Sequence, residues 1–323
     1  MIKYILLFAA VFMSPSVLLA ADKFAAQDLL DAAARQASLL EGSPRPFEMN
    51  VDFSAQFDTS RQGHLRLRWE AKDRWWSKVT VGPFEQVKFQ DGEKTYTLRN
   101  TDFTPTQVRD LMRLLHVGKD FDKLEVRKDK QRVDQGVTLD CMQAERRDLK
   151  NDRSEICVNV NTHEIASDTR KGFEDVVNRA QFSDFADFEQ HRYPRRLEWL
   201  KNGKTIITAS VTGLSDAPLD PQLLVPLQGA IERRDCANIK PPSMVKQAEL
   251  SFGGRSGLNG SSTVEITVLA DGKVGGIHVL QSAGPVIDDL VVEAIRASKY
   301  KPALCGTEPV VAEMVIDLGV HMH

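Results

Sequence analysis

The sequence has no long apolar run, and this absence limits how the chain can meet a membrane. Its longest unbroken apolar stretch is the nine residues from Ile5 to Met13, whereas a helix needs roughly 20 to cross a bilayer. Lys3 precedes this stretch, and small residues follow it at Ala20 and Ala21. The order predicts a Sec-type signal peptide over residues 1–21 and a periplasmic mature protein, with retention as an inner-membrane anchor as the alternative.

The chain also lacks an excess of either charge and lacks the short motifs of common enzymes. Its formal net charge is -3, and basic and acidic residues are interspersed, which excludes the basic surface of a nucleic-acid-binding protein. No Gly-x-Ser-x-Gly, His-Glu-x-x-His, P-loop or dinucleotide motif occurs. We therefore expect no catalytic residue, cofactor or metal site and no nucleic-acid partner. His321 and His323 are interpreted as part of a frayed tail.

Cysteine is scarce, with two pairs far apart in the sequence: Cys141 with Cys157, and Cys236 with Cys305. An even number of cysteines in an exported chain predicts two disulfides. Three connectivities are possible, and pairing within each of two domains needs no swapping. A zinc site is the alternative, and the absence of Cys-x-x-Cys spacing argues against it.

Periodicity predicts an α+β protein of two domains. About 300 residues remain after the signal peptide, more than one compact core usually organises. The expected boundaries are 25–226 for the first domain, 227–242 for a proline-rich linker with a short helix at 227–233, and 243–323 for the second domain. Apolar residues at helical spacing predict helices at 25–40 and 104–117. Alternating residues predict strands at 47–53, 65–69, 75–81, 87–89, 95–98, 137–144, 154–160, 164–168, 195–199 and 205–212.

The order helix, strands, helix, strands, with the Tyr193-Pro194-Arg195-Arg196-Leu197 stretch and the segment ending at Pro226, resembles the LolA and LolB lipoprotein carriers. The resemblance implies a curved antiparallel half-barrel with two helices, whose concave face binds acyl chains. Four strand aromatics are candidates for an apolar lining: Trp69, Trp75, Trp76 and Phe89. The favoured interpretation is that these aromatics pack as ordinary core.

The last part of the chain predicts strand, turn, strand, helix and strand. Val264, Ile266 and Val268 alternate with polar residues, Asp271-Gly272 marks a turn, and 286–299 has helical spacing. With Tyr300-Lys301-Pro302-Ala303, this ββαβ pattern over residues 240–321 resembles the C-terminal domain of TonB. The resemblance implies binding of outer-membrane transporters by addition of a receptor segment to the edge of the sheet.

If the resemblance holds, a partner binds along the edge strand 311–320 and the segment 247–252. The candidate residues are Gln247, Leu250, Phe252, Val315, Ile316 and Leu318. Two departures from the family are visible: Phe252-Gly253 replaces its usual Tyr-Pro pair, and a folded domain replaces its membrane anchor and proline-rich spacer. We therefore expect a TonB-like adaptor that engages an outer-membrane transporter or another envelope protein. A periplasmic carrier of lipid or lipoprotein acyl chains is the alternative function.

Overall fold

The computed structural model describes residues 15–43, 45–134, 136–148, 153–171, 176–234, 236, 239–248 and 259–321. The chain divides into two compact units, and each is built from two separate stretches of sequence. The first unit comprises Met1–Ser43 and Asp110–Val211, and the second comprises Pro44–Arg109 and Thr212–His323. The boundary expected at residue 226 does not coincide with a boundary between these units. No described helix is long and apolar enough to cross a membrane.

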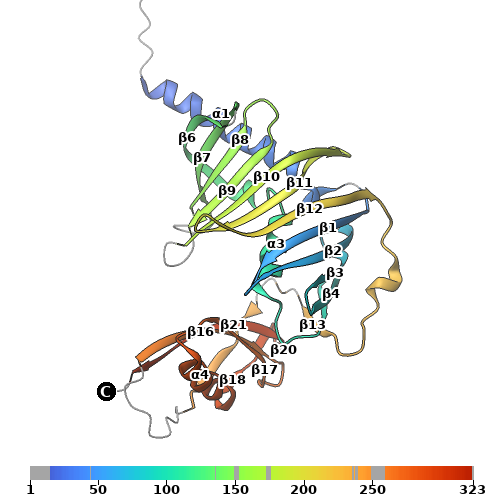
Figure 1. Cartoon of the computed structure of the whole chain (residues 1–323), viewed down its shortest axis with the longest axis vertical. Coiled ribbons are helices and arrows are strands. Elements are labelled where there is room, and N and C mark those ends of the chain that lie inside the picture. Colours follow the sequence, from blue (N-terminus) through green and yellow to red (C-terminus); the bar gives the residue numbers. More distant parts are fainter. Residues whose placement is uncertain are drawn as a thin grey trace, which may run out of the picture. The chain divides into compact units, whose positions relative to one another are not determined.

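The first unit packs an antiparallel sheet against a long helix. Its strands are neighbours in chain order. Helix α1 (Pro15–Ala37) runs behind this sheet and contacts β6, β8, β9 and β11 (Figure 1). Helix α2 (Leu39–Gly42) follows it. The strands are β6 (Leu124–Asp134), β7 (Val137–Arg146), β8 (Arg153–Asn159), β9 (Ile165–Lys171), β10 (Val177–Phe188), β11 (His191–Lys201) and β12 (Lys204–Asp216).

Apolar residues at helical spacing explain this packing. Leu30, Ala33 and Leu40 are fully or almost fully buried, which removes the apolar side of the helical segment from water. Tyr193 on β11 is buried too, and its hydroxyl donates to the carbonyl oxygen of Leu115. That hydrogen bond satisfies the one polar atom of an otherwise apolar contact.

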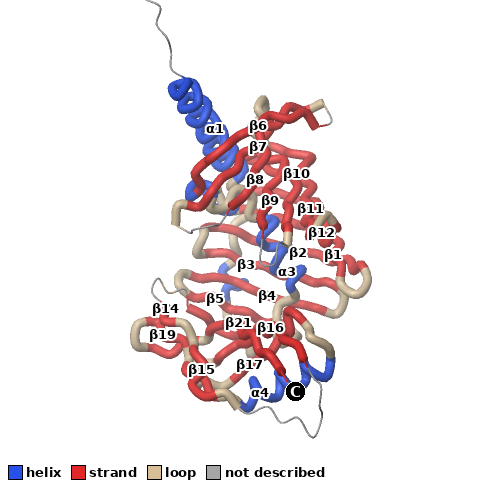
Figure 2. Tube along the Cα trace, turned by 90° about the vertical axis from the view of Figure 1, so that its left-hand side faces the viewer, coloured by secondary structure: helices blue, strands red, loops and turns tan. Residues whose placement is uncertain are grey.

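The second unit contains a meander in which each strand pairs with the next. Its strands lie side by side in Figure 2. Strand β13 pairs with β5 at the end of this order. The strands are β1 (Phe47–Gln56), β2 (Ser60–Ala71), β3 (Arg74–Val81), β4 (Phe84–Asp91), β5 (Lys94–Arg99) and β13 (Ile231–Arg234). Helix α3 (Thr106–Leu115) follows β5, and the short 3-10 helix η3 (Pro221–Leu224) packs on β3 and β4.

The C-terminal part of the second unit is built around a three-stranded antiparallel sheet in the order β17, β16, β21, with α4 on one face. Its principal elements are β16 (Asn259–Val268), β17 (Val274–Gln281), α4 (Pro285–Ala297) and β21 (Ala312–His321). Five short strands accompany them in two small sheets: β14 (Ile239–Lys240), β15 (Ser243–Lys246), β18 (Lys299–Lys301), β19 (Ala303–Cys305) and β20 (Glu308–Val310).

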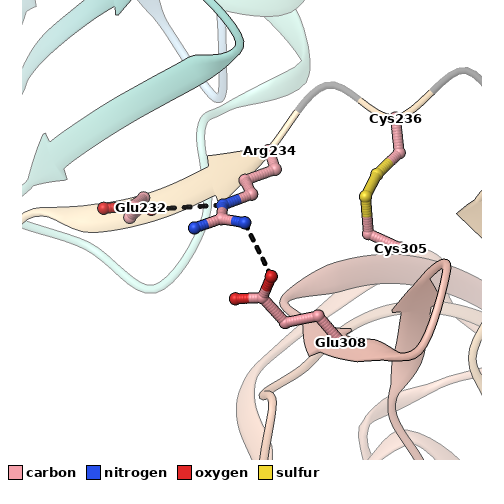
Figure 3. Close-up of a disulfide and its surroundings, with 5 residues drawn as sticks. All are labelled: Glu232, Arg234, Cys236, Cys305 and Glu308. Atoms are coloured by element: carbon pink, nitrogen blue, oxygen red, sulfur yellow. Dashed lines mark hydrogen bonds and ion pairs between the residues drawn. A yellow bond between two sulfur atoms is a disulfide. The ribbon is translucent and has the colours of Figure 1, made fainter.

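Two disulfides are present, and each joins the two cysteines of one predicted pair. Cys141 and Cys157 lie directly opposite one another on β7 and β8. Cys236 joins Cys305, 69 residues further along the chain (Figure 3). Beside this second disulfide, Arg234 bridges the carboxylates of Glu232 and Glu308. The end of β13 is therefore fastened to the β19–β20 hairpin by one covalent bond and one ion pair.

The structure confirms the predicted mixture of antiparallel strands with helices at 25–40, 104–117 and 286–299. The short helix predicted at 227–233 is wrong, because residues 231–234 instead form β13 against β5. The simple ββαβ order also needs correction, since β18, β19 and β20 lie between α4 and β21. Most of the predicted signal peptide lies outside the described residues, and the expected cleavage point at Ala20 or Ala21 lies within α1.

Candidate partner-binding site

Strand β21 is an edge strand with one side paired and one side open within the described part of the chain. It pairs with β16 over ten consecutive residue pairs, from Ala312 opposite Val268 to His321 opposite Asn259. Figure 2 shows β21 beside β16. Strand β17 pairs with the other side of β16. An edge strand presents backbone donors and acceptors that a further strand can satisfy.

The two faces of β21 differ in chemistry. Ile316 and Leu318 are both 8% exposed and join a core with Val264, Ile266 and α4. The alternate residues face the other way, because successive side chains of a strand point to opposite faces. Val315 on that face is 55% exposed. Asp317 is exposed as well, and it accepts a hydrogen bond of 2.6 Å from the Thr263 hydroxyl.

The turn between β16 and β17 brings together two segments of the predicted family pattern. Gly272 has a φ of +81°, which favours glycine. A Cβ at this position would lie 2.7 Å from the carbonyl oxygen of Tyr300. The Tyr300 ring is buried in the core beneath α4, and its hydroxyl donates to the carbonyl of Ile295. The turn and the Tyr300 segment therefore fix one another's position.

Charged and aromatic side chains contact the sheet face opposite α4. Nη1 of Arg109 lies 2.7 Å from both carboxylate oxygens of Glu265, a side chain that is 8% exposed. Arg233 donates to one carboxylate oxygen of Glu313. The Phe103 ring stacks on His278 with ring centroids 5.7 Å apart. These contacts hold the N-terminal half of β21 and the middle of β16, and they leave Val315 and Asp317 accessible.

The charged side chains near Glu313 shift one another's pKa values. Burial, with the positive charges of Arg233 and Arg99, lowers the pKa of Lys88. Burial opposes ionisation of Glu313, but the hydrogen bond and charge of Arg233 outweigh it and lower the pKa of that carboxyl. Glu313 is thereby held as a carboxylate among cations.

The residues predicted to bind a partner include accessible side chains, buried side chains and residues outside the described part of the chain. Val315 is accessible, whereas Ile316 and Leu318 direct their side chains into the core, so that only their backbone is available to a partner. Gln247 is exposed just beyond β15. Leu250 and Phe252 lie outside the described residues. The sequence pattern located the edge strand, and burial distinguishes Val315 from its neighbours.

The four aromatics proposed as one apolar lining lie on two faces of the sheet. Trp76 pairs with Phe89 across β3 and β4, and both are covered by Leu219 and Leu224. Trp69 pairs with Trp75 on the opposite face, where Trp69 also stacks on the Phe47 ring. Three of the four are almost fully buried: Trp69, Trp76 and Phe89. They do not form a single lining, and they contribute to two separate packed clusters.

Sequence reasoning missed a cavity of about 620 Å³ in the first unit. Its lining includes Ala180, Phe182 and Trp199 from β10 and β11. The Arg170–Asp168 ion pair, 3.0 Å long, lies at the same cavity. The opposite wall is the end of α3 and the following residues up to Phe121. This volume falls within the range of small-molecule sites. Among the described residues, no group of three or more His, Cys, Asp or Glu side chains is placed to hold a metal ion.

Comparison with known proteins gives matches to solved structures and to one sequence family. A LolA superfamily protein from Nitrosomonas europaea is 10% identical with a TM-score of 0.43, covering 61% of this chain and 97% of its own. A lipoprotein-sorting protein domain from Vibrio parahaemolyticus is 6% identical with a TM-score of 0.42, covering 61% and 94%. The MucA/MucB complex of Pseudomonas aeruginosa is 11% identical with a TM-score of 0.25, covering 69% and 70%. No curated protein sequence matches the chain.

The family match falls on the sheet that contains the candidate site. It includes all of β16, β17 and α4, and it continues through β21 as far as Leu318. The turn at Gly272 and the Tyr300 segment that packs on it are both inside the matched region. The predicted resemblance is thus confirmed, because residues 254–318 match the family described as Gram-negative bacterial TonB protein C-terminal.

Proposed function

We propose that this protein is a periplasmic adaptor that captures an extended segment of an envelope protein along the open edge of β21. The observation that supports this most directly is the combination of an edge strand with a TonB-type domain. A segment added there gains main-chain hydrogen bonds along the strand, whatever its side chains. The role is binding and not catalysis, and transmission of energy is not part of the proposal.

The partner that we propose is an outer-membrane transporter, the class of protein that the TonB resemblance implies. The contacts at Glu265 and Glu313 support a fixed orientation of the sheet within the second unit. An edge strand that is already fixed loses little conformational entropy when a flexible segment binds to it, so the free-energy cost of binding is lower.

The test is photocrosslinking in intact cells from position 315, because Val315 is 55% exposed on the edge strand. Val286 on α4 provides a matched control, since it is an exposed valine in the same domain. We expect a transporter adduct from position 315 and none from position 286. Efficient incorporation of the probe without any adduct at position 315 would contradict the proposal.

A second candidate function is binding of an apolar or amphipathic molecule in the cavity of the first unit. Phe182 and Trp199 are only partly buried there, and charged groups lie beside them. Such a lining suits a molecule with an apolar body and a polar end.

Filling the cavity tests this second function. Ala180 on β10 is 5% exposed and lines the cavity, so Ala180→Trp should displace any bound molecule. Ser210→Trp, at an exposed position of β12, is the control for a tryptophan added to the same sheet. Native mass spectrometry of freshly purified protein should show a bound mass in the wild type and in the Ser210 variant, and should show none in the Ala180 variant. Wild-type protein free of any bound molecule would contradict this function.

A further inference from the structure

The exposed half of β21 carries a pattern that selects the side chains of an added strand. Val315 and Asp317 are two residues apart, so that their side chains point to the same face of the sheet. Both are exposed, whereas Ile316 between them is buried against α4. An added strand would place two of its own side chains directly beside this pair.

Charge at this position is not balanced within the described part of the protein. Asp317 accepts a hydrogen bond from the neutral Thr263 hydroxyl, and no described lysine, arginine or histidine forms an ion pair with it. Glu265 and Glu313 on the same face differ, because Arg109 and Arg233 already neutralise them. Asp317 is therefore the carboxylate on this face of β21 that remains available to a cation from a partner.

The neighbouring Val315 favours an apolar side chain of the partner, whereas Asp317 favours a basic one. With 55% of its surface exposed, it is among the large apolar side chains that the protein leaves in water. An apolar side chain placed beside it would remove part of that surface from water. A polar side chain of the partner placed beside Val315 would not gain this hydrophobic stabilisation.

We propose that β21 binds a strand carrying an apolar residue beside Val315 and a lysine or arginine beside Asp317. This inference rests on the proposed strand capture and specifies its partner chemistry. The two side chains are separated by one residue in the partner. Their order reveals the strand direction: a parallel strand carries apolar-x-basic, and an antiparallel strand carries basic-x-apolar. Orientation and sequence preference are thus set by two side chains.

The experiment measures binding of fluorescent heptapeptides to the full-length protein by anisotropy. The central residues are Val-Thr-Lys or Lys-Thr-Val, flanked by threonines, and in a second set glutamate replaces lysine. We expect one lysine peptide to bind the wild type roughly tenfold more tightly than its glutamate counterpart, as favourable and like-charge cross-strand pairs differ. Asp317→Lys should reverse this preference. Val315→Thr should weaken the binding of the lysine peptide and of its glutamate counterpart by roughly equal factors.

Glu293→Lys is the matched control, because Glu293 is exposed on α4 and the change in net charge is identical. This variant should keep the wild-type preference for lysine. If lysine and glutamate peptides bind equally to the wild type, the charge rule is overturned while strand capture stands. If none of the peptides binds the wild type, strand capture and the charge rule are both overturned.

Discussion

Glu265 is a carboxylate in the middle of a strand, almost removed from water. Its side chain is 8% exposed, and both oxygens accept from Arg109. A buried carboxylate without a cation is costly, because water no longer solvates the charge. The Arg109 side chain retains 29% exposure, which reduces the cost relative to a fully buried pair.

Removal of Arg109 is therefore expected to destabilise the protein. Arg109→Met should lower the free energy of unfolding by about 3 kcal/mol, since Glu265 loses its cation. The double variant Arg109→Met with Glu265→Gln should recover a large part of this loss, because no unpaired charge remains. Urea unfolding followed by circular dichroism measures both. Equal losses in the single and double variants would show that the carboxylate is not the cause.

At the scale of elements, the conformation of single turns affects the stability of the fold, and Gly272 and Gly306 can be compared. At Gly272 a Cβ would meet the Tyr300 carbonyl oxygen at 2.7 Å, whereas at Gly306 no atom lies within 4 Å, although both residues have positive φ. Each alanine substitution incurs the left-handed backbone cost of roughly 1 kcal/mol. Only Gly272→Ala adds a backbone clash, so its unfolding free energy should fall by at least about 1 kcal/mol more than that of Gly306→Ala. Thermal unfolding of the two variants checks this, and equal losses would refute it.

Strands with clear alternation were predicted from the sequence, and those without it were missed. Strand β6 was missed because residues 127–134 are exposed on both faces and six of these eight residues are charged, so no alternation of apolar and polar residues is visible. Strand β10 has hardly any buried residue to reveal a period of two. Strand β13 is four residues long and forms because β5 is beside it. Tertiary pairing, rather than local propensity, determines such segments.

The candidate site was predicted in the same uneven way. The edge strand predicted at 311–320 is present as β21, and its residues Ile316 and Leu318 lie in the core. The strand aromatics were candidates for one lining, with core packing as the favoured interpretation, and they lie on two faces of the sheet. Cross-strand register decides which residues share a face, and a one-residue shift reverses the answer. The cavity in the first unit was missed because its walls come from segments far apart in the chain.

At the scale of the whole molecule, the free energy of unfolding depends on pH because some carboxyls pair with cations in the folded state. Arg233 holds the pKa of Glu313 below its usual value, with burial acting in the opposite direction. A carboxyl with a depressed folded pKa contributes stability above its unfolded pKa, near 4.3, and loses that contribution as pH falls through the folded pKa. Acidification should therefore weaken the contact between β13 and β21.

Comparison with Glu313→Gln isolates this contribution from other carboxyls. The wild type should be more stable than the variant at pH 7, and the difference should shrink as the pH falls below about 4.3. Glu293→Gln, at an exposed position on α4, should show no such trend. Urea unfolding at several pH values measures the difference. A difference that stays constant from pH 7 to pH 3 would contradict the assigned role of Glu313.

The length of the β16–β21 pairing determines how the domain responds to mechanical force. A partner strand bound to β21 and pulled along its own axis would load this pairing in shear. Inter-strand hydrogen bonds of an antiparallel pair run perpendicular to the strands, and β21 is joined to β16 at ten residue pairs. Those bonds would share the load and would have to break together rather than one after another. The geometry therefore makes β21 resist being pulled lengthwise out of the sheet more strongly than being peeled away from one end.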